Sequence, residues 1–405
     1  MQTNNSVDNS RTYHLTSAVC SAEEYSRLII DDKYKSAQAA IKFFRVFLDG
    51  FVKNGKTVKV FSKRPVSRKT SGERYIRSKK EVVDGVQYHY SRLFNMRYIG
   101  NLYSLLSSFF WYLSGRNCKR GDIVFIDPLN VAISFGTAMA CKLRGIKTVG
   151  IITDVPECYV YSSGKNSRAL KMSRRVNKMA DAYVFLTEAM NEVVNPTGKP
   201  YLVVEGFVHS DMKDAQNTLD EKYEKKVCMY TGGVEKIYGL DMLVDGFLYA
   251  DVPDSELHIY GAGKFAKELS EYSERDARIK YLGCRDNSEV VLEQMKATLL
   301  INPRYTDAEF TKYSFPSKTS EYIVSATPTL TTRLPGIPPE YFEHVFALDR
   351  EDAEGMGEKI REILSMTREE LHEFGLSAKS WILENKNDKM QISRIIEFIN
   401  EKVSK

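Results

Sequence analysis

The chain has 405 residues, a formal net charge of +5, and apolar and charged fractions of 43% and 27%. These values are typical of soluble globular proteins and exclude a fibrous or wholly disordered chain. At roughly 150 residues per domain the length predicts two or three domains, of which we adopt two. The positive charge is too small to indicate nucleic acid by itself, so we expect no nucleic-acid partner.

The six cysteines and six histidines show no ligand spacing such as CxxC or HExxH, so the sequence predicts no metal site. The N-terminus, MQTNNSVDNSRTYH, is polar and unlike a signal peptide. Unpaired thiols without a leader are typical of a reducing compartment. We therefore expect a cytoplasmic protein.

The first half alternates helix-like and strand-like segments. Apolar residues spaced by three and four predict a helix over 36–52, and 56–61 has the pattern of a β-strand. The β-rich runs GDIVFIDP, IKTVGIITDVPE, DAYVFLTE and YLVVEGFVH follow, with helical patterns near 129–143 and 165–180. This alternation predicts βαβ units in a parallel sheet.

The second half repeats this alternation after a polar, charged stretch at 210–226, which has the composition of a linker. We expect an N-terminal domain over 1–209, a C-terminal domain over 227–386, and a final helix over 387–405 that can pack back on the first domain. The sequence therefore predicts an α/β protein with two doubly wound, Rossmann-like domains facing a central cleft.

Glycines follow two strands of the second half, where ligands of open α/β sheets collect. Gly232 and Gly233 would let backbone amides approach an anion, with Lys236 nearby to neutralise its charge, although paired glycines also form ordinary turns. Gly261 and Gly263 form a GxG without the third glycine of a dinucleotide fingerprint, which favours a tight strand-to-helix turn.

A third strand-to-helix turn lies in YSFPSKTSEYIVSATP, residues 313–328. Pro316 suits a first helical turn, and the amides after it, with Lys318, form an anion site. Glu321 lies one turn further on the same side, and a carboxylate can accept from both hydroxyls of a ribose. The segment predicts a diphosphate pocket followed by a ribose clamp; the alternative is an exposed Lys–Glu surface pair.

The order of these segments resembles the nucleotide-binding domain of retaining glycosyltransferases of the GT-B fold, family 4. The resemblance rests on TGGVEKIYG, YGAG, YLGC and the stretch from Tyr313 to Glu321 followed by SATP; it spans about 227–335 and extends only loosely to the first half. It implies transfer of a sugar from a nucleotide sugar, with UDP-sugar favoured, to a glycan or lipid-linked glycan. Retention of configuration, no metal or other cofactor, and a role in surface polysaccharide biosynthesis are also implied.

Single residues of this sequence also match functional positions of the family. Glu321 matches the ribose-binding glutamate, and the backbone at Cys284 and Arg285 falls where the family contacts the base. The family's other glutamate is replaced by Tyr313, and its phosphate-binding Arg and Lys are replaced by Gly233 and Tyr238, so Lys318 and Lys236 would supply the charge. The implied donor-binding set is Gly232, Gly233, Lys236, Gly261, Gly263, Cys284, Arg285, Ser314, Phe315, Pro316, Ser317, Lys318 and Glu321.

Asp154, Tyr313 and Lys318 are the catalytic candidates implied by the resemblance. Asp154 ends a predicted strand where many family members carry a cleft-facing histidine; the alternative is a residue that caps or turns the chain. Two other activities stay open: a non-enzymatic relative that stabilises a partner transferase, which Tyr313 favours, and a sugar-nucleotide epimerase.

Three segments bear on membrane contact. Residues 63–80 and the predicted helix 165–180 are basic and can lie on an anionic membrane at its inner face, or simply form a solvated surface. The run 98–115, YIGNLYSLLSSFFWYLSG, is free of charge but rich in serine. It predicts a helix that is buried or touches a membrane rather than one that crosses it.

Overall fold

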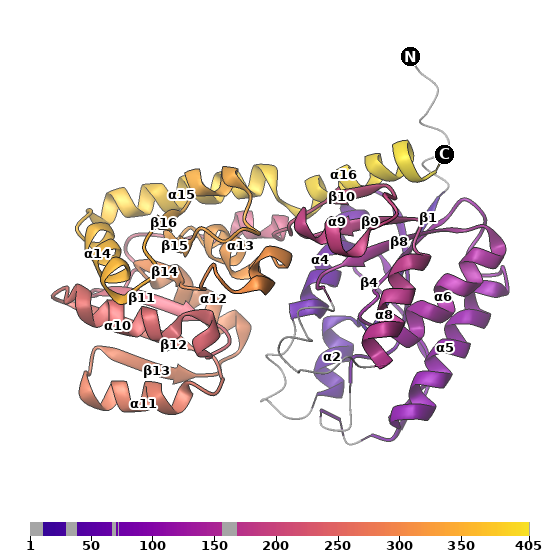
Figure 1. Cartoon of the computed structure of the whole chain (residues 1–405), viewed down its shortest axis with the longest axis horizontal. Helices are drawn as coiled ribbons and strands as arrows, with labels where there is room; N and C mark the ends of the chain where they lie inside the picture. The colour runs from indigo at the N-terminus through magenta and orange to yellow at the C-terminus, as the bar shows by residue number, and fades with distance from the viewer. Residues whose placement is uncertain (1–10, 30–38, 67–69, 72, 156–167, 405) are drawn as a thin grey trace, which may run out of the picture. The chain divides into compact units, whose positions relative to one another are not determined.

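The computed structural model describes residues 11–29, 39–66, 70–71, 73–155 and 168–404. The chain divides into two compact units (Figure 1). The first unit holds Met1–Phe207 together with Asp388–Lys405, and the second holds Val208–Asn387. Each unit is built on its own predominantly or wholly parallel sheet.

The first unit has an eight-stranded sheet in the order β10-β9-β8-β7-β1-β2-β5-β4, parallel except for the β4–β5 hairpin. Its strands are β1 (Thr12–Ser17), β2 (Thr57–Ser62), β4 (Lys79–Val83), β5 (Val86–Tyr90), β7 (Ile123–Ile126), β8 (Lys147–Ile152), β9 (Ala182–Phe185) and β10 (Tyr201–Val203). A separate antiparallel pair joins β3 (Tyr75–Ile76) and β6 (Leu93–Phe94). Its helices are α2 (Ala22–Leu28), α4 (Ala39–Lys53), α5 (Arg97–Leu113), α6 (Val131–Arg144), α8 (Arg168–Met179), α9 (Ala189–Val194) and α16 (Asp388–Phe398), which ends in a π turn over Ile399–Val403.

The strands of the first unit are apolar because they lie in its core. Every residue of β7 and β9 is buried, as expected for parallel strands covered on both faces. The ring of Phe47 on α4 lies 5.0 Å from that of Phe125 on β7. Ile392 and Ile395 of α16 belong to the same core, so the last helix of the chain helps to close the first unit.

The second unit has a six-stranded parallel sheet in the order β13-β12-β11-β14-β15-β16. Its strands are β11 (Lys226–Thr231), β12 (Ser255–Tyr260), β13 (Ile279–Gly283), β14 (Leu299–Asn302), β15 (Thr329–Thr332) and β16 (Phe346–Leu348). Its helices are α10 (Leu240–Ala250), α11 (Ala266–Arg275), α12 (Asn287–Lys296), α13 (Ser317–Val324), α14 (Ala353–Leu364) and α15 (Arg368–Asn385), with short 3₁₀ turns η1 (Ser210–Asp214), η2 (Lys236–Tyr238), η3 (Glu309–Tyr313) and η4 (Pro339–Glu343).

The prediction of an α/β chain with two doubly wound domains is confirmed. The predicted linker, 210–226, is hydrogen-bonded to the second unit. Asn217 Nδ2 donates to the Ser325 carbonyl at 2.8 Å, and Lys222 Nζ donates to the Ala297 carbonyl at 2.9 Å. Burial lowers the pKa of Lys222 to about 7. This segment is therefore anchored along most of its length.

A buried ion cluster follows the carboxyl ends of β1 and β2 in the first unit. Glu24 on α2 accepts from Arg64 Nε at 2.7 Å, from Lys79 Nζ at 3.0 Å and from Arg27, and Arg64 is only 1% exposed. Burial alone would raise the pKa of Glu24, but these hydrogen bonds outweigh it and lower the pKa from 4.5 to about 2. Arg64 thus departs from the solvated basic run expected over 63–80.

We expect Glu24→Gln to lower the free energy of unfolding by about 3 kcal/mol, because it leaves the buried Arg64 guanidinium without its carboxylate. The stabilisation from a carboxylate with a depressed folded pKa is complete above pH 4.5 and is lost as the pH falls through about 2. Urea unfolding from neutral to acid pH measures both effects. Glu23→Gln, at the exposed neighbouring position, is the control and should change neither; equal pH dependence of wild type and Glu24→Gln would contradict the assignment.

Candidate functional site

The second sheet has a topological switch point between β11 and β14. The chain runs outward from β11 through β12 to β13 and then returns to form β14 on the other side of β11. Helices that follow neighbouring strands therefore leave in opposite directions, and the carboxyl ends of these strands border a crevice. The predicted glycine loops and the segment at 313–328 all follow strands of this sheet.

The glycine loops hold the ends of β11 and β12 in direct backbone contact. Gly232 N–H donates to the Tyr260 carbonyl at 2.8 Å, and Val234 N–H donates to the Ala262 carbonyl at 3.0 Å. A Cβ at Gly261 would overlap the Gly232 carbonyl oxygen, and one at Gly263 would overlap that of Val234. Gly261 also has φ +135°, so both steric contact and backbone conformation require glycine there.

Lys318 lies against this glycine surface. Its half-buried side chain ends beside Gly232, where a Cβ would overlap Cε and Nζ, and Nζ lies 5.9 Å from the ring centroid of Tyr230. The helix that carries it, α13, begins after Pro316 without a side-chain cap. The buried hydroxyl of Tyr322 on α13 accepts from Thr231 N–H at 2.9 Å, which fixes the helix on the end of β11.

A second cation, Arg304, reaches the same loops from the end of β14. Its guanidinium carbon lies 5.1 Å from the ring centroid of Tyr238, and Nη1 donates to Ser314 Oγ at 3.5 Å. Tyr238 packs on Gly233, at 2.8 Å from where a Cβ would stand. Burial raises the pKa of Tyr230, and the charge of Arg304 opposes that rise. Arg304 is not in the predicted set, although its place two residues after a strand end was a usable signal.

Lys236 points to a different partner. Its ammonium pairs with Glu268 of α11 at 2.7 Å and lies 5.3 Å from the ring centroid of Phe265. The hydrogen bond that its ammonium donates to the Glu268 carboxylate raises the pKa of Lys236. The structure therefore brings Lys318 and Arg304 to the glycine loops and gives Lys236 a separate ion pair.

The remaining predicted residues of this unit differ in exposure. Tyr313 and Ser314 are half-buried, Phe315 and Pro316 are buried, and Ser317, Glu321, Cys284 and Arg285 are exposed. The Phe315 ring packs 5.4 Å from that of Tyr341, so its side chain serves the interior. Burial raises the pKa of the Tyr260 phenol. The positive charge of Arg285 lies close enough to oppose part of that rise.

The first unit has its own row of groups at the carboxyl edge of its sheet. Asp154 follows β8 and is half-buried, and Asp127 follows β7, where it accepts from Ser17 Oγ at 2.7 Å. Burial raises the pKa of Asp127. Lys63 follows β2, and burial lowers its pKa. Lys63 was predicted only as part of a basic run, which hides its place at a strand end.

A possible metal-ligand group lies at the opposite edge of the first sheet. Among the described residues, His14, Cys118 and Asp122 bring ligand atoms within 4.8 Å of one another. Asp122 already accepts from Thr12 N–H at 3.0 Å and from Lys119 N–H at 2.7 Å, and its carboxylate lies 3.4 Å from His14 Nε2. Three protein ligands are one fewer than a closed structural zinc site uses, and as many as a catalytic zinc site uses. The expectation that the chain has no metal site stays a prediction.

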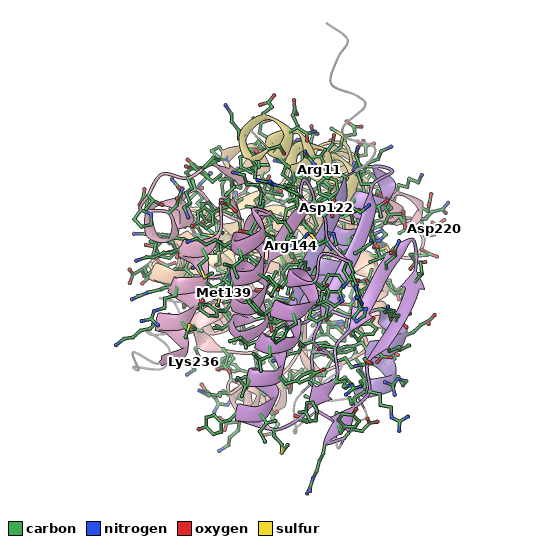
Figure 2. The ribbon with its side chains drawn as sticks, turned by 90° about the vertical axis from the view of Figure 1, so that its right-hand side faces the viewer. Arg11, Asp122, Met139, Arg144, Asp220 and Lys236 are labelled. Carbon is green, nitrogen blue, oxygen red and sulfur yellow. The ribbon has the colours of Figure 1, made fainter. Side chains whose placement is uncertain are left out.

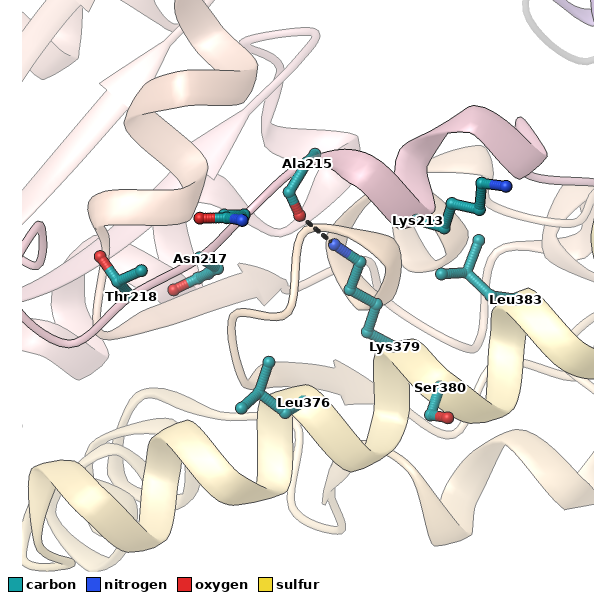
Figure 3. A pocket seen from close by; sticks show the side chains of 9 residues that line it. Lys213, Ala215, Asn217, Thr218, Leu376, Lys379, Ser380 and Leu383 are labelled. Atoms are coloured by element: carbon teal, nitrogen blue, oxygen red, sulfur yellow. Dashed lines mark hydrogen bonds between the residues drawn. The ribbon is translucent and has the colours of Figure 1, made fainter.

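An open cavity of about 400 Å³ lies elsewhere in the second unit, between residues 213–218 and α15 (Figure 3). Lys379 of α15 donates to the Ala215 carbonyl across it, and burial lowers the pKa of Lys379. Asn217 ties this region to Ser325, at the carboxyl end of α13. Lys318 lies at the other end of that helix, so the cavity is separate from the strand-end site.

Solved structures of other proteins share the fold of this chain. The chain matches sucrose-phosphate synthase of Thermosynechococcus elongatus at TM-score 0.68 and 12% identity, covering 96% of this chain and 99% of that one. It matches the UDP-forming α,α-trehalose-phosphate synthase of Burkholderia xenovorans at TM-score 0.66 and 12% identity (96% and 100%), and Anabaena HepE in complex with UDP at 0.60 and 13% (96% and 99%). At these identities the similarity shows the fold, which is the GT-B fold of glycosyltransferases.

A protein-family model matches part of the second unit. Residues 225–366 match the model of the family Glycosyl transferases group 1. These residues contain the strand-end site, including Gly232, Arg304 and Lys318. The second unit thus contains a region that is similar to group 1 glycosyltransferases, and the predicted GT-B fold is confirmed. No curated protein sequence matches the chain.

Substitution of Gly261 tests the backbone contact on which the site is built. Gly261→Ala should lower the free energy of unfolding by about 1–3 kcal/mol more than Gly283→Ala, because only the first adds steric overlap with a neighbouring carbonyl. Gly283 is a matched control, since it also has positive φ but open space around it. Urea denaturation measures the difference, and equal losses would contradict the tight contact.

Proposed function

We propose that the protein is a glycosyltransferase that moves a sugar from a nucleoside-diphosphate sugar, with UDP-sugar favoured, to a glycan or lipid-linked glycan. The observation that carries the proposal is the convergence of Lys318 and Arg304 on the glycine ends of β11 and β12, at the switch point of a region that is similar to group 1 glycosyltransferases. The presence of UDP in the HepE structure supports the choice of nucleotide.

The departing diphosphate would lie at the amino end of α13. Glycine amides and the helix N-terminus supply oriented N–H groups, and Lys318 and Arg304 supply two positive charges. Lys318 and Arg304 replace the family's Arg and Lys, which are Gly233 and Tyr238 here. An oxocarbenium-like transition state depends on stabilisation of the leaving group, and preorganised charge provides it without a metal or a protein nucleophile.

The nucleoside would lie beyond the phosphates. Glu321 is exposed one turn after Lys318, where its carboxylate can accept from the ribose hydroxyls. The backbone after β13, at Cys284 and Arg285, would contact the base. The set Gly232, Gly233, Gly261, Gly263, Ser314, Phe315, Pro316 and Ser317 would line the donor site through backbone atoms as well as side chains.

We propose that Asp154 contacts the acceptor or donor sugar and that Tyr313, which replaces the family's glutamate, approaches the donor sugar. The sugar would be transferred with retention of anomeric configuration. The biological setting we propose is synthesis of a surface polysaccharide in the cytoplasm. Asp154 stands at a strand end of the first unit, the position at which open α/β sheets bind ligands.

Neutralising the two cations should weaken nucleotide binding. We expect Lys318→Gln and Arg304→Gln each to raise the Kd for UDP by about tenfold or more, because each removes a charge-assisted contact to a phosphate. Isothermal titration calorimetry measures this. Lys236→Gln should change Kd less, since its ammonium pairs with Glu268, and Lys359→Gln on α14 is the unrelated control.

Unchanged UDP affinity in both cation variants would contradict the proposed diphosphate site. If a cation variant loses affinity and also melts at a lower temperature, the loss could come from a destabilised fold. Lys318→Arg separates this cause from the loss of charge. This variant keeps the charge and should retain most of the binding if charge is what matters.

The ribose clamp is tested by comparing UDP with 2′-deoxy-UDP. The wild-type protein should bind UDP about tenfold more tightly, because a hydrogen bond from a hydroxyl to a carboxylate is lost in the deoxy compound. In Glu321→Ala this preference should disappear, and transfer should fall with it. A preference that persists in Glu321→Ala would assign the ribose contact to another residue.

The reaction itself is tested with a panel of nucleotide sugars. Proton NMR of the product should show the anomeric configuration of the donor sugar, and a chelator should leave the rate unchanged. Inversion or metal dependence would overturn the corresponding part of the proposal. Conversion of the donor sugar without any acceptor would indicate an epimerase, and binding without hydrolysis or transfer would indicate a non-catalytic partner protein.

A further inference from the structure

Helix α5 of the first unit exposes a stripe of large apolar residues, which a helix that only covers a sheet would bury. Besides Ile99 (53% exposed), its exposed large residues recur every three or four positions: Tyr98 (82%), Leu102 (59%), Leu106 (42%), Phe110 (60%) and Leu113 (36%). A surface helix normally turns such a stripe inward and its polar residues outward. Packing in the core of this unit therefore does not account for the apolar residues of the stripe.

The inward side of α5 packs against α6 and the sheet, and it carries two small serines and the buried Tyr112, whose hydroxyl lies 2.8 Å from Thr16 Oγ1 of β1. Ser104 and Ser108 are buried, and Ser108 Oγ donates to the Ile133 carbonyl of α6 at 2.9 Å. A Cβ at Gly136 of α6 would overlap the Leu105 carbonyl, so the two helices pack almost backbone to backbone. Ser104, Ser108 and Tyr112 thus lie inside, and the apolar stripe lies outside, which is the arrangement expected when the outward neighbour of α5 is itself apolar.

The apolar stripe belongs to a wider surface formed by three neighbouring helices. Helix α6 packs between α5 and α8 in the first unit (Figure 1), and α6 exposes Met139 and Leu143, of which Met139 is labelled in Figure 2. Helix α8 exposes Lys171, Arg174, Arg175 and Lys178. We call this surface the α5–α6–α8 layer.

The charge of the α5–α6–α8 layer has one sign. None of the three helices contains an Asp or a Glu. Exposed basic residues also follow the carboxyl end of α5, at Arg116, Lys119 and Arg120. A large apolar stripe bordered by exposed cations, on helices that contain no acidic residue, is complementary to an anionic lipid surface, where side chains such as Leu and Phe enter the acyl boundary and Lys and Arg contact headgroups.

We propose that the α5–α6–α8 layer docks on an anionic lipid bilayer, with α5 in the interfacial region and the cations of α8 on the headgroups. The contact would be peripheral, since in the part of the chain that the structure describes no helix has the length and apolarity needed to cross a membrane. The docking surface differs from the basic run at 63–80, and it needs neither donor binding nor transfer. A lipid-linked acceptor would be concentrated at this surface.

Vesicle flotation of the full chain tests the proposal. The protein should float with vesicles of phosphatidylcholine mixed with phosphatidylglycerol about tenfold more than with pure phosphatidylcholine, and high salt should reduce the difference. The double variant Leu102→Gln/Phe110→Gln should lose most binding to either vesicle. Lys171→Gln/Lys178→Gln should lose the preference for phosphatidylglycerol while keeping the weak, salt-independent binding.

The control variant is Leu292→Gln/Met390→Gln, which changes two similarly exposed apolar residues outside the layer and should float like the wild type. UDP-induced stabilisation should be the same in all variants, which separates failure of docking from failure of the donor site. Wild-type protein that does not float with anionic vesicles overturns the proposal. A dimer that dissociates in Leu102→Gln/Phe110→Gln would also overturn it and assign the stripe to a second copy of the chain.

Discussion

The site in the second unit depends on the contact between the backbones of two strand ends. Gly232 and Gly261 meet with no side chain between them, and Gly263 approaches Val234 in the same way. Because these positions carry no Cβ, peptide groups themselves form the surface and Lys318 can lie directly on it. Any larger residue at Gly232 would occupy the volume of the lysine side chain, and one at Gly261 would separate β11 from β12. Both the shape and the charge of the surface follow from this steric constraint.

The two cations are held in different ways. Lys318 is positioned by a helix whose Tyr322 hydroxyl is hydrogen-bonded to Thr231, so its backbone is fixed relative to β11. Arg304 lies against the rings of Tyr238 and Phe310, with its guanidinium carbon 5.1 Å and 5.5 Å from their centroids. Charges that are already in place cost little reorganisation when a negative leaving group develops, which is why such positioning favours group transfer.

Periodicity and strand-end rules were enough to predict the α/β fold, the glycine turns and the helix that carries Lys318, because each of these depends on local sequence. Arg304 follows a predicted strand, but only the pairing of β14 with β11, between residues about seventy positions apart, places it beside the glycine loops. The ion pair of Lys236 could not be predicted from local sequence because its partner, Glu268, lies on a different helix. For α5 the spacing shows that two of its serines lie opposite the apolar stripe, but only packing against α6 shows which side faces inward.

The position of α16 in the sequence affects the order in which the two units can fold. Its isoleucines complete the core of the first unit, yet they are encoded after the whole second unit. During translation part of the apolar interior of the first unit therefore stays uncovered until the whole second unit and α16 have left the ribosome. The second unit has no such dependence and can fold as soon as it emerges. A chain truncated before Asp388 would release a finished second unit attached to an incomplete first unit prone to aggregation.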